Sequence, residues 1–244
     1  MKGDSSLQKK HQQLIRLAQK RRCLTPNGFN SITDYHHGAY DCDYVSPYSK
    51  YAGNLNASVM LILQDWCSDD FLSQPLNRNL IHYGIEPSFP TTRNLEQYLQ
   101  RYFQLSVAQT YGTNLFPFVK PGAMAGNITI GELIQAAEQF TLEEIEIIAP
   151  KVAVCFGVAT YNALLRAAKE QNRLKDTSLK PVKNLNQAIE QPFLLSFSSK
   201  VKVWICAQSH PGGLGRACRN KGKVDRVSQD WQQMAQFVKQ IPFA

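Results

Sequence analysis

The sequence predicts an α/β protein, a three-layer α/β/α sandwich around a central, mostly parallel, four-stranded sheet. From residue 58 onward, short apolar runs alternate with segments of helical periodicity. This alternation is typical of parallel strands covered by helices on both faces. Two of the runs break abruptly into polar residues, at Gln64-Asp65-Trp66 and at Gln208-Ser209-His210. A length of 244 residues with 43% hydrophobic composition suits one such domain with a small N-terminal addition.

Four strands are expected in this sheet. The apolar runs that predict them are residues 59–63, 110–116, 152–156 and 201–207. Gly157 follows the third run, and a glycine there allows a tight turn into the next helix.

Helical periodicity predicts the covering layers. The expected helices are residues 5–22, 94–103, 130–140, 159–169 and 227–241. A capping box from Thr141 to Glu144 predicts the start of a further helix that ends near Pro150. Residues 25–57 and 171–200 are expected to be loops, the first packed by its aromatic side chains. We divide the chain into an N-terminal helix-and-loop appendage, residues 1–44, and an α/β domain, residues 45–244.

The charge balance favours a polyanionic partner. The net charge is +8 and the isoelectric point is near 9.2, and neutralising phosphates releases counterions. One basic cluster lies near the start of the chain and a second follows His210. The second cluster consists of Arg216, Arg219, Lys221, Lys223 and Arg226. Its place beside a candidate site strengthens the case for nucleic acid.

Composition also predicts what is absent. No apolar stretch approaches the roughly 20 residues that span a bilayer, and the N-terminus lacks a secretory signal, so a cytoplasmic protein is expected. The six cysteines never fall as CxxC, which argues against a disulfide framework or a zinc site. The pair His36-His37 has no partner at ligand spacing. We therefore expect no metal and no membrane contact.

Polar side chains with catalytic potential stand at the ends of predicted strands. Asp65 follows the run 59–63, His210 follows the last run, and Asn114 lies in the second. Ligands of open α/β sheets bind beyond the carboxyl ends of the strands, so these groups are expected to share one crevice. Simpler roles remain open: a turn or helix cap for Asp65, a buried loop histidine for His210, and loop anchoring for Asn114.

Three short motifs at these strand ends carry a family resemblance. They are Leu63-Gln64-Asp65-Trp66-Cys67, Thr113-Asn114-Leu115-Phe116-Pro117-Phe118 and His210-Pro211-Gly212-Gly213-Leu214. By their order, spacing and strand-end placement, the chain from Val45 onward resembles the uracil-DNA glycosylase superfamily. The resemblance implies hydrolysis of the N-glycosidic bond of a damaged base, most simply uracil, in base-excision repair. It implies no cofactor, and the cysteine spacing does not fit the iron–sulfur branches of the family.

The resemblance also assigns roles to residues. Asp65 would position or deprotonate the attacking water and stabilise the sugar cation, and a neutral His210 would donate a hydrogen bond to the departing base. Asn114 would pair with the Watson–Crick edge of a pyrimidine, beside the main chain of Gln64. Phe71 or Tyr83 would stack on the base.

A base inside a duplex must be flipped out before it can be cleaved. Leu214 takes the place of the family's wedge residue, with an ordinary core position as the alternative. Gly212 and Gly213 would allow a close approach to phosphates, and Ser209 and Arg216 would complete the DNA-contacting surface.

The sequence departs from the family at Trp66 and Cys67. The best-known branch has proline and then a tyrosine that rejects the thymine methyl group, so the choice of base stays open here. Cys67 itself is expected to be a packed, base-contacting residue rather than a nucleophile. Two other functions remain as alternatives: a non-catalytic nucleic-acid-binding protein of the same fold, or a hydrolase of free nucleosides or nucleotides. A monomer that acts on single- or double-stranded DNA is expected.

Overall fold

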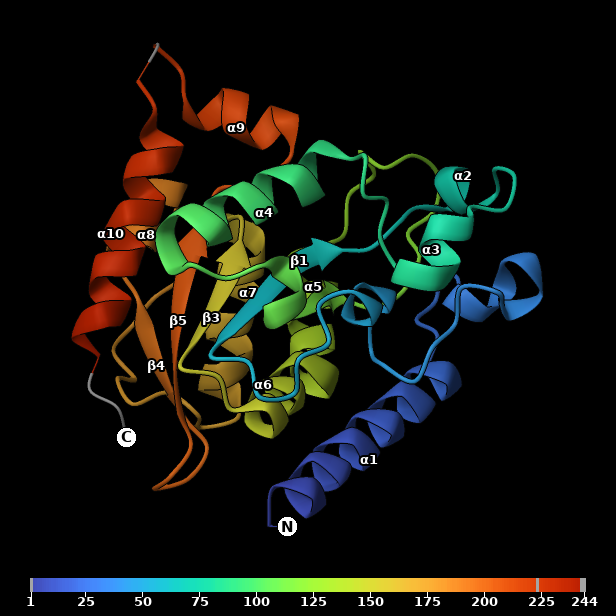
Figure 1. The fold of residues 1–244 in the computed structure, drawn as a ribbon, viewed down its shortest axis with the longest axis horizontal. Helices are drawn as coiled ribbons and strands as arrows, with labels where there is room; N and C mark the ends of the chain where they lie inside the picture. Colours follow the sequence, from blue (N-terminus) through green and yellow to red (C-terminus); the bar gives the residue numbers. More distant parts are fainter. Residues whose placement is uncertain (1, 223, 242–244) are drawn as a thin grey trace.

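The computed structural model of the chain describes residues 2–222 and 224–241 and has a five-stranded sheet at its centre (Figure 1). The strand order is β2-β1-β3-β5-β4. The first four strands of this order run parallel, and β4 runs antiparallel to β5. The strands are β1 (Val59–Asp65), β2 (Tyr111–Phe116), β3 (Val152–Phe156), β4 (Phe193–Ser196) and β5 (Lys202–Gln208). The α/β class is confirmed, but the expected strand number of four is wrong.

The additional strand β4 is short and lies at the edge of the sheet. Phe193 and Leu195 point into the core, whereas Leu194 and Ser196 are half-buried. A tight connection, in which the N–H of Phe197 donates to the carbonyl of Val201, returns the chain into β5. A run of four residues followed by serines carries little hydrophobic periodicity, so the sequence did not indicate a strand there. The segment containing β4 was therefore predicted as part of the loop over residues 171–200.

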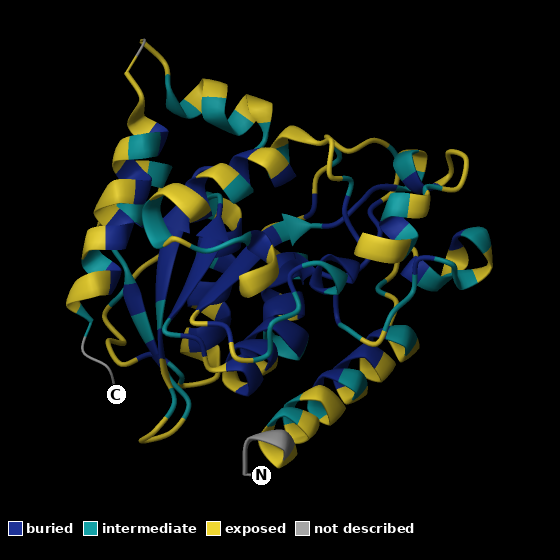
Figure 2. Cartoon of the chain, in the orientation of Figure 1, coloured by how far each residue is buried: buried dark blue, intermediate teal, exposed yellow. Residues whose placement is uncertain are grey.

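Helices cover both faces of the sheet, because the side chains of each strand alternate between two apolar clusters. Met60 and Ile62 join the first cluster, and Leu61 and Leu63 join the second. The first contains residues of α5 (Ile130–Ala136), α6 (Leu142–Ile148) and α7 (Val158–Glu170); the second contains residues of α4 (Pro90–Phe103) and α10 (Arg226–Gln240). Figure 2 shows the buried strands in dark blue between these layers.

The N-terminal helix α1 (Lys2–Cys23) packs on the domain. Leu14 and Leu17 belong to the same apolar cluster as α6. Lys10 Nζ donates to the carbonyls of Leu55 and Ile148, both at 2.9 Å. The expected appendage, residues 1–44, therefore shares a core with the domain 45–244.

Shorter elements connect and flank these layers. Tyr35, Tyr40 and Tyr48 are buried, as expected for a loop region packed by aromatic residues. No helix within the described residues is both long and apolar enough to cross a bilayer. The short elements are η1 (Ile32–Asp34), η2 (His36–Gly38), η3 (Pro47–Lys50), α2 (Asp69–Leu72), α3 (Arg78–Tyr83), η4 (Val107–Gln109), α8 (Leu185–Glu190) and α9 (Gly213–Arg219).

The predicted capping box at Thr141 and Glu144 is wrong. α5 continues through a π-helical turn, Ala137–Thr141, directly into α6, and Thr141 itself has helical backbone angles. In this part of the chain a capping box forms instead at the start of α5, between Thr129 and Glu132. Glu144 instead enters the core, where its carboxyl group accepts hydrogen bonds from Tyr111 at 2.8 Å and Thr113 at 2.9 Å.

Glu144 is a buried titratable group that none of the expected functions uses. Burial raises its pKa to about 8, against the smaller lowering effect of the hydroxyl groups of Tyr111 and Thr113. Its pKa is therefore higher in the folded than in the unfolded chain, and folding favours the protonated form. This contribution to stability is complete below the ordinary value of 4.5 and is lost as the pH rises toward 8.

Replacing Glu144 with glutamine should remove this pH dependence. Relative to wild type, the free energy of unfolding of E144Q should rise by up to about 1.4 kcal/mol per pH unit between pH 4.5 and 8. Urea denaturation of both proteins across that range measures the difference. Parallel stability curves for the two proteins would contradict a buried carboxyl group that ionises late.

Candidate functional site

A cavity of about 200 Å³ opens at the carboxyl ends of β1, β2 and β5. Asp65 ends β1, Asn114 lies in β2, and His210 follows β5; all three line the cavity. The structure thus brings together the three polar groups that the sequence placed at strand ends. The apolar part of the lining consists of Tyr48, Leu63, Trp66, Cys67, Phe71, Leu80, Ile85, Phe89 and Met124.

The carboxylate of Asp65 is held from two sides. Its Oδ2 lies 2.8 Å from Lys120 Nζ, and its Oδ1 accepts a hydrogen bond from Gln64 Nε2 at 3.2 Å. Among the described residues, no backbone N–H donates to this carboxylate, and α2 has Ser68 as its N-cap. Asp65 is therefore not a helix cap, and its carboxylate remains at the cavity wall.

His210 is arranged as a hydrogen-bond donor. The N–H of Gly212 donates to its Nδ1 at 3.1 Å, so the single proton of the neutral ring belongs on Nε2. The ring lies at the exposed rim, yet the protein packed around it lowers its pKa, against the opposing effect of the charge of Asp65. Near neutral pH the ring is therefore uncharged, with an N–H to offer a ligand.

Asn114 offers a second donor. Its Oδ1 accepts from Ser46 Oγ at 2.6 Å, and that oxygen in turn accepts from the N–H of Tyr48. This chain fixes the orientation of the amide. The Nδ2 of Asn114 has no hydrogen-bond partner among the described residues, and Asn114 lines the cavity. Its N–H groups are free for a ligand.

Aromatic rings form one wall of the cavity. Phe71 contacts Phe89, with ring centroids 5.8 Å apart, and both line the cavity. Tyr83, the other candidate for stacking, does not line it and is 47% exposed. The indole of Trp66 is fixed by a 2.7 Å hydrogen bond to the carbonyl of Gly84. Phe71 is thus the better placed stacking candidate, and Phe89 is a ring that sequence reasoning missed.

Cys67 lines the cavity, whereas Gln64 does not. Cys67 is buried in the cavity wall, and burial raises the pKa of its thiol well above its usual range. The neutral thiol is a small apolar wall group rather than a nucleophile. Gln64, whose main chain was expected to border the base, does not line the cavity, although its side chain contacts Asp65.

Beyond His210 the chain forms the exposed helix α9. Leu214 is 84% exposed, so it is not a core residue. Gly213 is exposed as well, and a Cβ atom on Gly212 would lie 3.0 Å from the imidazole Nδ1 of His210. A Cβ atom on Gly215 would meet the carbonyl oxygen of His210 at 2.2 Å, so only glycine permits this approach.

Two residues that were expected to contact DNA face the protein instead. Arg216 donates to Asn94 Oδ1 at 3.0 Å and lies over the ring of Tyr98, 5.9 Å from its centroid. Ser209 is buried, and its hydroxyl group has no hydrogen-bond partner among the described residues. The Arg216 side chain therefore connects α9 to α4, to which Asn94 and Tyr98 belong. Exposed positive charge beyond α9 comes from Lys221 and Arg226.

Sequence reasoning missed two charged residues: Glu86, which lines the cavity, and Lys120. Lys120 follows β2, is buried, and contacts Asp65 across a sequence separation of 55 residues. No local pattern marks a single lysine for this contact. Among the described residues, no group of three or more His, Cys, Asp or Glu side chains could hold a metal ion.

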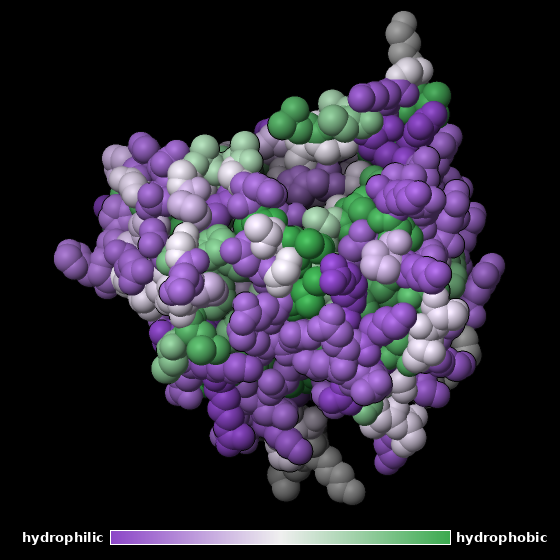
Figure 3. Space-filling view, turned by 180° about the vertical axis from the view of Figure 1, so that it is seen from behind, coloured by the Kyte–Doolittle hydropathy of each residue, from purple (hydrophilic) through white to green (hydrophobic). Residues whose placement is uncertain are grey.

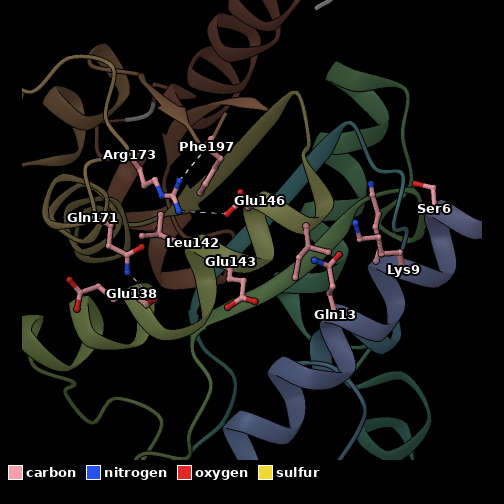
Figure 4. A pocket seen from close by; sticks show the side chains of 12 residues that line it. Ser6, Lys9, Gln13, Glu138, Leu142, Glu143, Glu146, Gln171, Arg173 and Phe197 are labelled. Carbon is pink, nitrogen blue, oxygen red and sulfur yellow. Dashed lines mark hydrogen bonds and ion pairs between the residues drawn. The ribbon is translucent and has the colours of Figure 1, made fainter. Parts of the chain in front are cut away.

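A second cavity, of about 570 Å³, is larger and is lined by charged residues of both signs. It lies between α1, α6 and the end of α7 (Figure 4). Lys9, Glu143 and Arg173 contribute charges of both signs, and Arg173 pairs with Glu146 at 3.9 Å. Its lining includes Phe197, directly after the antiparallel edge strand β4, and no residue from the carboxyl end of a parallel strand. The smaller cavity, with its unpaired donors, is the stronger candidate site.

Exposed apolar side chains surround part of the smaller cavity. Phe89 and Met124 line it and are 41% and 48% exposed. Figure 3 shows hydrophobic side chains in separate groups on an otherwise hydrophilic face.

No protein-family model and no curated protein matches this sequence significantly. The function is therefore inferred from the residues, from the strand-end motifs and from the geometry of the cavity.

The contact of Arg216 with Asn94 should keep α9 ordered. R216M should raise hydrogen exchange of the α9 amides by about tenfold or more, since a hydrogen bond to a charged group contributes about 1.5–3 kcal/mol. Exchange followed by mass spectrometry checks this. K221M, which changes an exposed lysine just beyond α9, is the control, and equal exchange in both variants would refute the contact's role.

Proposed function

We propose that this protein is a DNA glycosylase that hydrolyses the N-glycosidic bond of a flipped-out damaged base, most simply uracil, in base-excision repair. The observation that carries the proposal is one base-sized cavity bordered by a carboxylate, a neutral imidazole N–H and a free amide N–H. The resemblance of the three strand-end motifs to the uracil-DNA glycosylase superfamily supports it.

The chemistry follows from the placement of Asp65 and His210. When the bond from C1′ of the sugar to the base nitrogen breaks, the sugar becomes positively charged and the base takes the electron pair. The carboxylate of Asp65 stabilises the cation and accepts a proton from the water that attacks C1′. The Nε2–H of His210 donates to the base oxygen on which negative charge gathers. No metal or cofactor takes part.

The donors of the cavity favour a particular class of base. Asn114 Nδ2 and His210 Nε2 both present N–H groups, which match carbonyl oxygens. An exocyclic amino group, as in adenine or cytosine, would face a donor at the same place. Uracil, thymine and hypoxanthine fit this pattern, and Phe71 and Phe89 offer aromatic faces for stacking.

The surface beside the cavity suits DNA. Leu214 projects from α9 and could fill the gap that a flipped nucleotide leaves in a duplex. The net charge of +8 favours a polyanion. We propose a cytoplasmic monomer that acts on single- or double-stranded DNA.

A second candidate is a non-catalytic nucleic-acid-binding protein. The departures from the family at Trp66 and Cys67 favour it, because both residues line the cavity beside Asp65. A hydrolase of free nucleosides is a third outcome, and such an enzyme would not need the exposed Leu214.

A panel of oligonucleotides tests these functions. Wild-type protein should release uracil, hypoxanthine or mismatched thymine from DNA and leave abasic sites. D65N should lower the single-turnover rate by about 10²–10⁴-fold. L214A should slow cleavage of duplex more than of single strands, because only a duplex needs the wedge.

The other outcomes of the panel are distinct. Salt-dependent binding without base release from any oligonucleotide would support the non-catalytic candidate and contradict the glycosylase. Cleavage of free nucleosides with L214A fully active would support the third candidate.

Cys67 should decide whether a substituent on the pyrimidine ring is accepted. C67L narrows the cavity, so it should lower cleavage of mismatched thymine at least tenfold more than cleavage of uracil, since one methyl group changes discrimination by about 10–200-fold. C67A, which removes the thiol without narrowing the cavity, is the control. The ratio of the cleavage rates for uracil and mismatched thymine is measured in competition between the two oligonucleotides. An unchanged ratio in C67L would show that the methyl group of thymine does not lie against residue 67.

A further inference from the structure

Lys120 is buried beneath the candidate site, and its ammonium group has a specific partner there. Its side chain is 4% exposed, and Nζ lies 2.8 Å from Asp65 Oδ2, whose side chain is 12% exposed. The second contact of the ammonium group is the carbonyl of Met124, a residue that lines the cavity. Lys120 itself does not line the cavity. It therefore acts on a ligand only through its neighbours.

A buried ammonium group is unfavourable unless it is paired and hydrogen-bonded. Most of the described lysine side chains are exposed to solvent. The more exposed ion pair between Arg173 and Glu146 has a distance of 3.9 Å, longer than the 2.8 Å between Lys120 and Asp65. Packing alone would be satisfied by methionine at position 120. The charge at this position thus needs a reason beyond filling space.

The backbone around Lys120 is fixed to the segment that follows Asp65. Its carbonyl accepts from the N–H of Asp69 at 2.9 Å, and the carbonyl of Gly122 accepts from the N–H of Asp70 at 3.0 Å. A parallel bridge joins Ser68 to Lys120. The ends of β1 and β2 are therefore connected twice, once through the backbone and once through the ion pair.

The ion pair restricts the carboxylate to one orientation. Lys120 holds Oδ2 and Gln64 holds Oδ1, so rotation of the carboxylate would break one of these contacts. His210 and the buried thiol of Cys67 are two further titratable groups that interact electrostatically with Asp65. Neither of them is positively charged near neutral pH. Lys120 alone of these three neighbours supplies a compensating charge.

We propose that Lys120 is a positioning residue, which orients the Asp65 carboxylate toward the attacking water and compensates the burial of its charge. This role rests on the proposed glycosylase function. It gives Lys120 a part in the chemical step and none in binding DNA.

The test combines the single-turnover rate of base release with the dissociation constant for the same oligonucleotide. K120M should lower the rate at least tenfold and leave the dissociation constant within about twofold, because the side chain does not line the cavity. K120R, which retains the charge, should recover much of the rate. In the D65N background, K120M should change the residual rate little, because the group that it orients is already neutral.

K50M is the matched control. Lys50 is half-buried, and its Nζ donates to the carbonyls of Tyr40 and Ile81 and forms no ion pair with a carboxylate in the part of the chain that the structure describes. It should lower the melting temperature and leave the rate unchanged. If K120M fails to fold, K120Q, which retains a hydrogen-bond donor without the charge, replaces it with the same expectation.

The outcomes separate the two proposals. A wild-type protein that releases no base overturns the glycosylase function itself. An active wild type with K120M or K120Q at the wild-type rate overturns the role of Lys120 alone. So does a K120M effect that is equally large in the D65N background, because it would show that Lys120 acts independently of Asp65.

Discussion

The convergence of parallel strand ends at one edge of the sheet is the constraint on which the site depends. The pairing of β1 with β2 places Leu63 opposite Asn114, so Asp65 ends close to the amide. β3 lies between β1 and β5 and ends at Phe156, and the next residue, Gly157, has a φ of 95° and begins the turn into α7. No residue of β3 lines the cavity, so the ends of β1 and β5 border one space, in which His210 lies with Asp65.

Hydrogen bonds to the protein then decide what each polar group can offer a ligand. The N–H of Gly212 occupies Nδ1 of His210, and the hydroxyl of Ser46 occupies Oδ1 of Asn114. In both side chains the acceptor atom is already used by the protein, so the group left for a ligand is an N–H donor, Nε2 of His210 and Nδ2 of Asn114. Asp65 is the reverse case, an acceptor held by donors on both oxygens. The two donors and the Asp65 carboxylate are complementary to a base with carbonyl oxygens and to a sugar that becomes cationic.

The parts of this arrangement that the sequence predicts are those with a local signal. Buried parallel strands are continuous apolar runs, so the ends of β1 and β5 were evident, and so were Asp65 and His210. Contacts over long sequence separations carry no such signal: Lys120 with Asp65, Ser46 with Asn114, and Arg216 with Asn94. Local patterns also misled. Thr141 and Glu144 have the spacing of a capping box, yet Glu144 is drawn into the core by the hydroxyl groups of β2.

The central claim is that an extrahelical base occupies the cavity between Asp65 and His210. A crystal structure with an oligonucleotide that carries 2′-fluoro-deoxyuridine, whose glycosidic bond resists cleavage, tests it directly. The account predicts the uracil ring inside the cavity, with one carbonyl oxygen within hydrogen-bond distance of Asn114 Nδ2 and another near His210 Nε2. A base that stays stacked in the DNA, or lies outside this cavity, would contradict it.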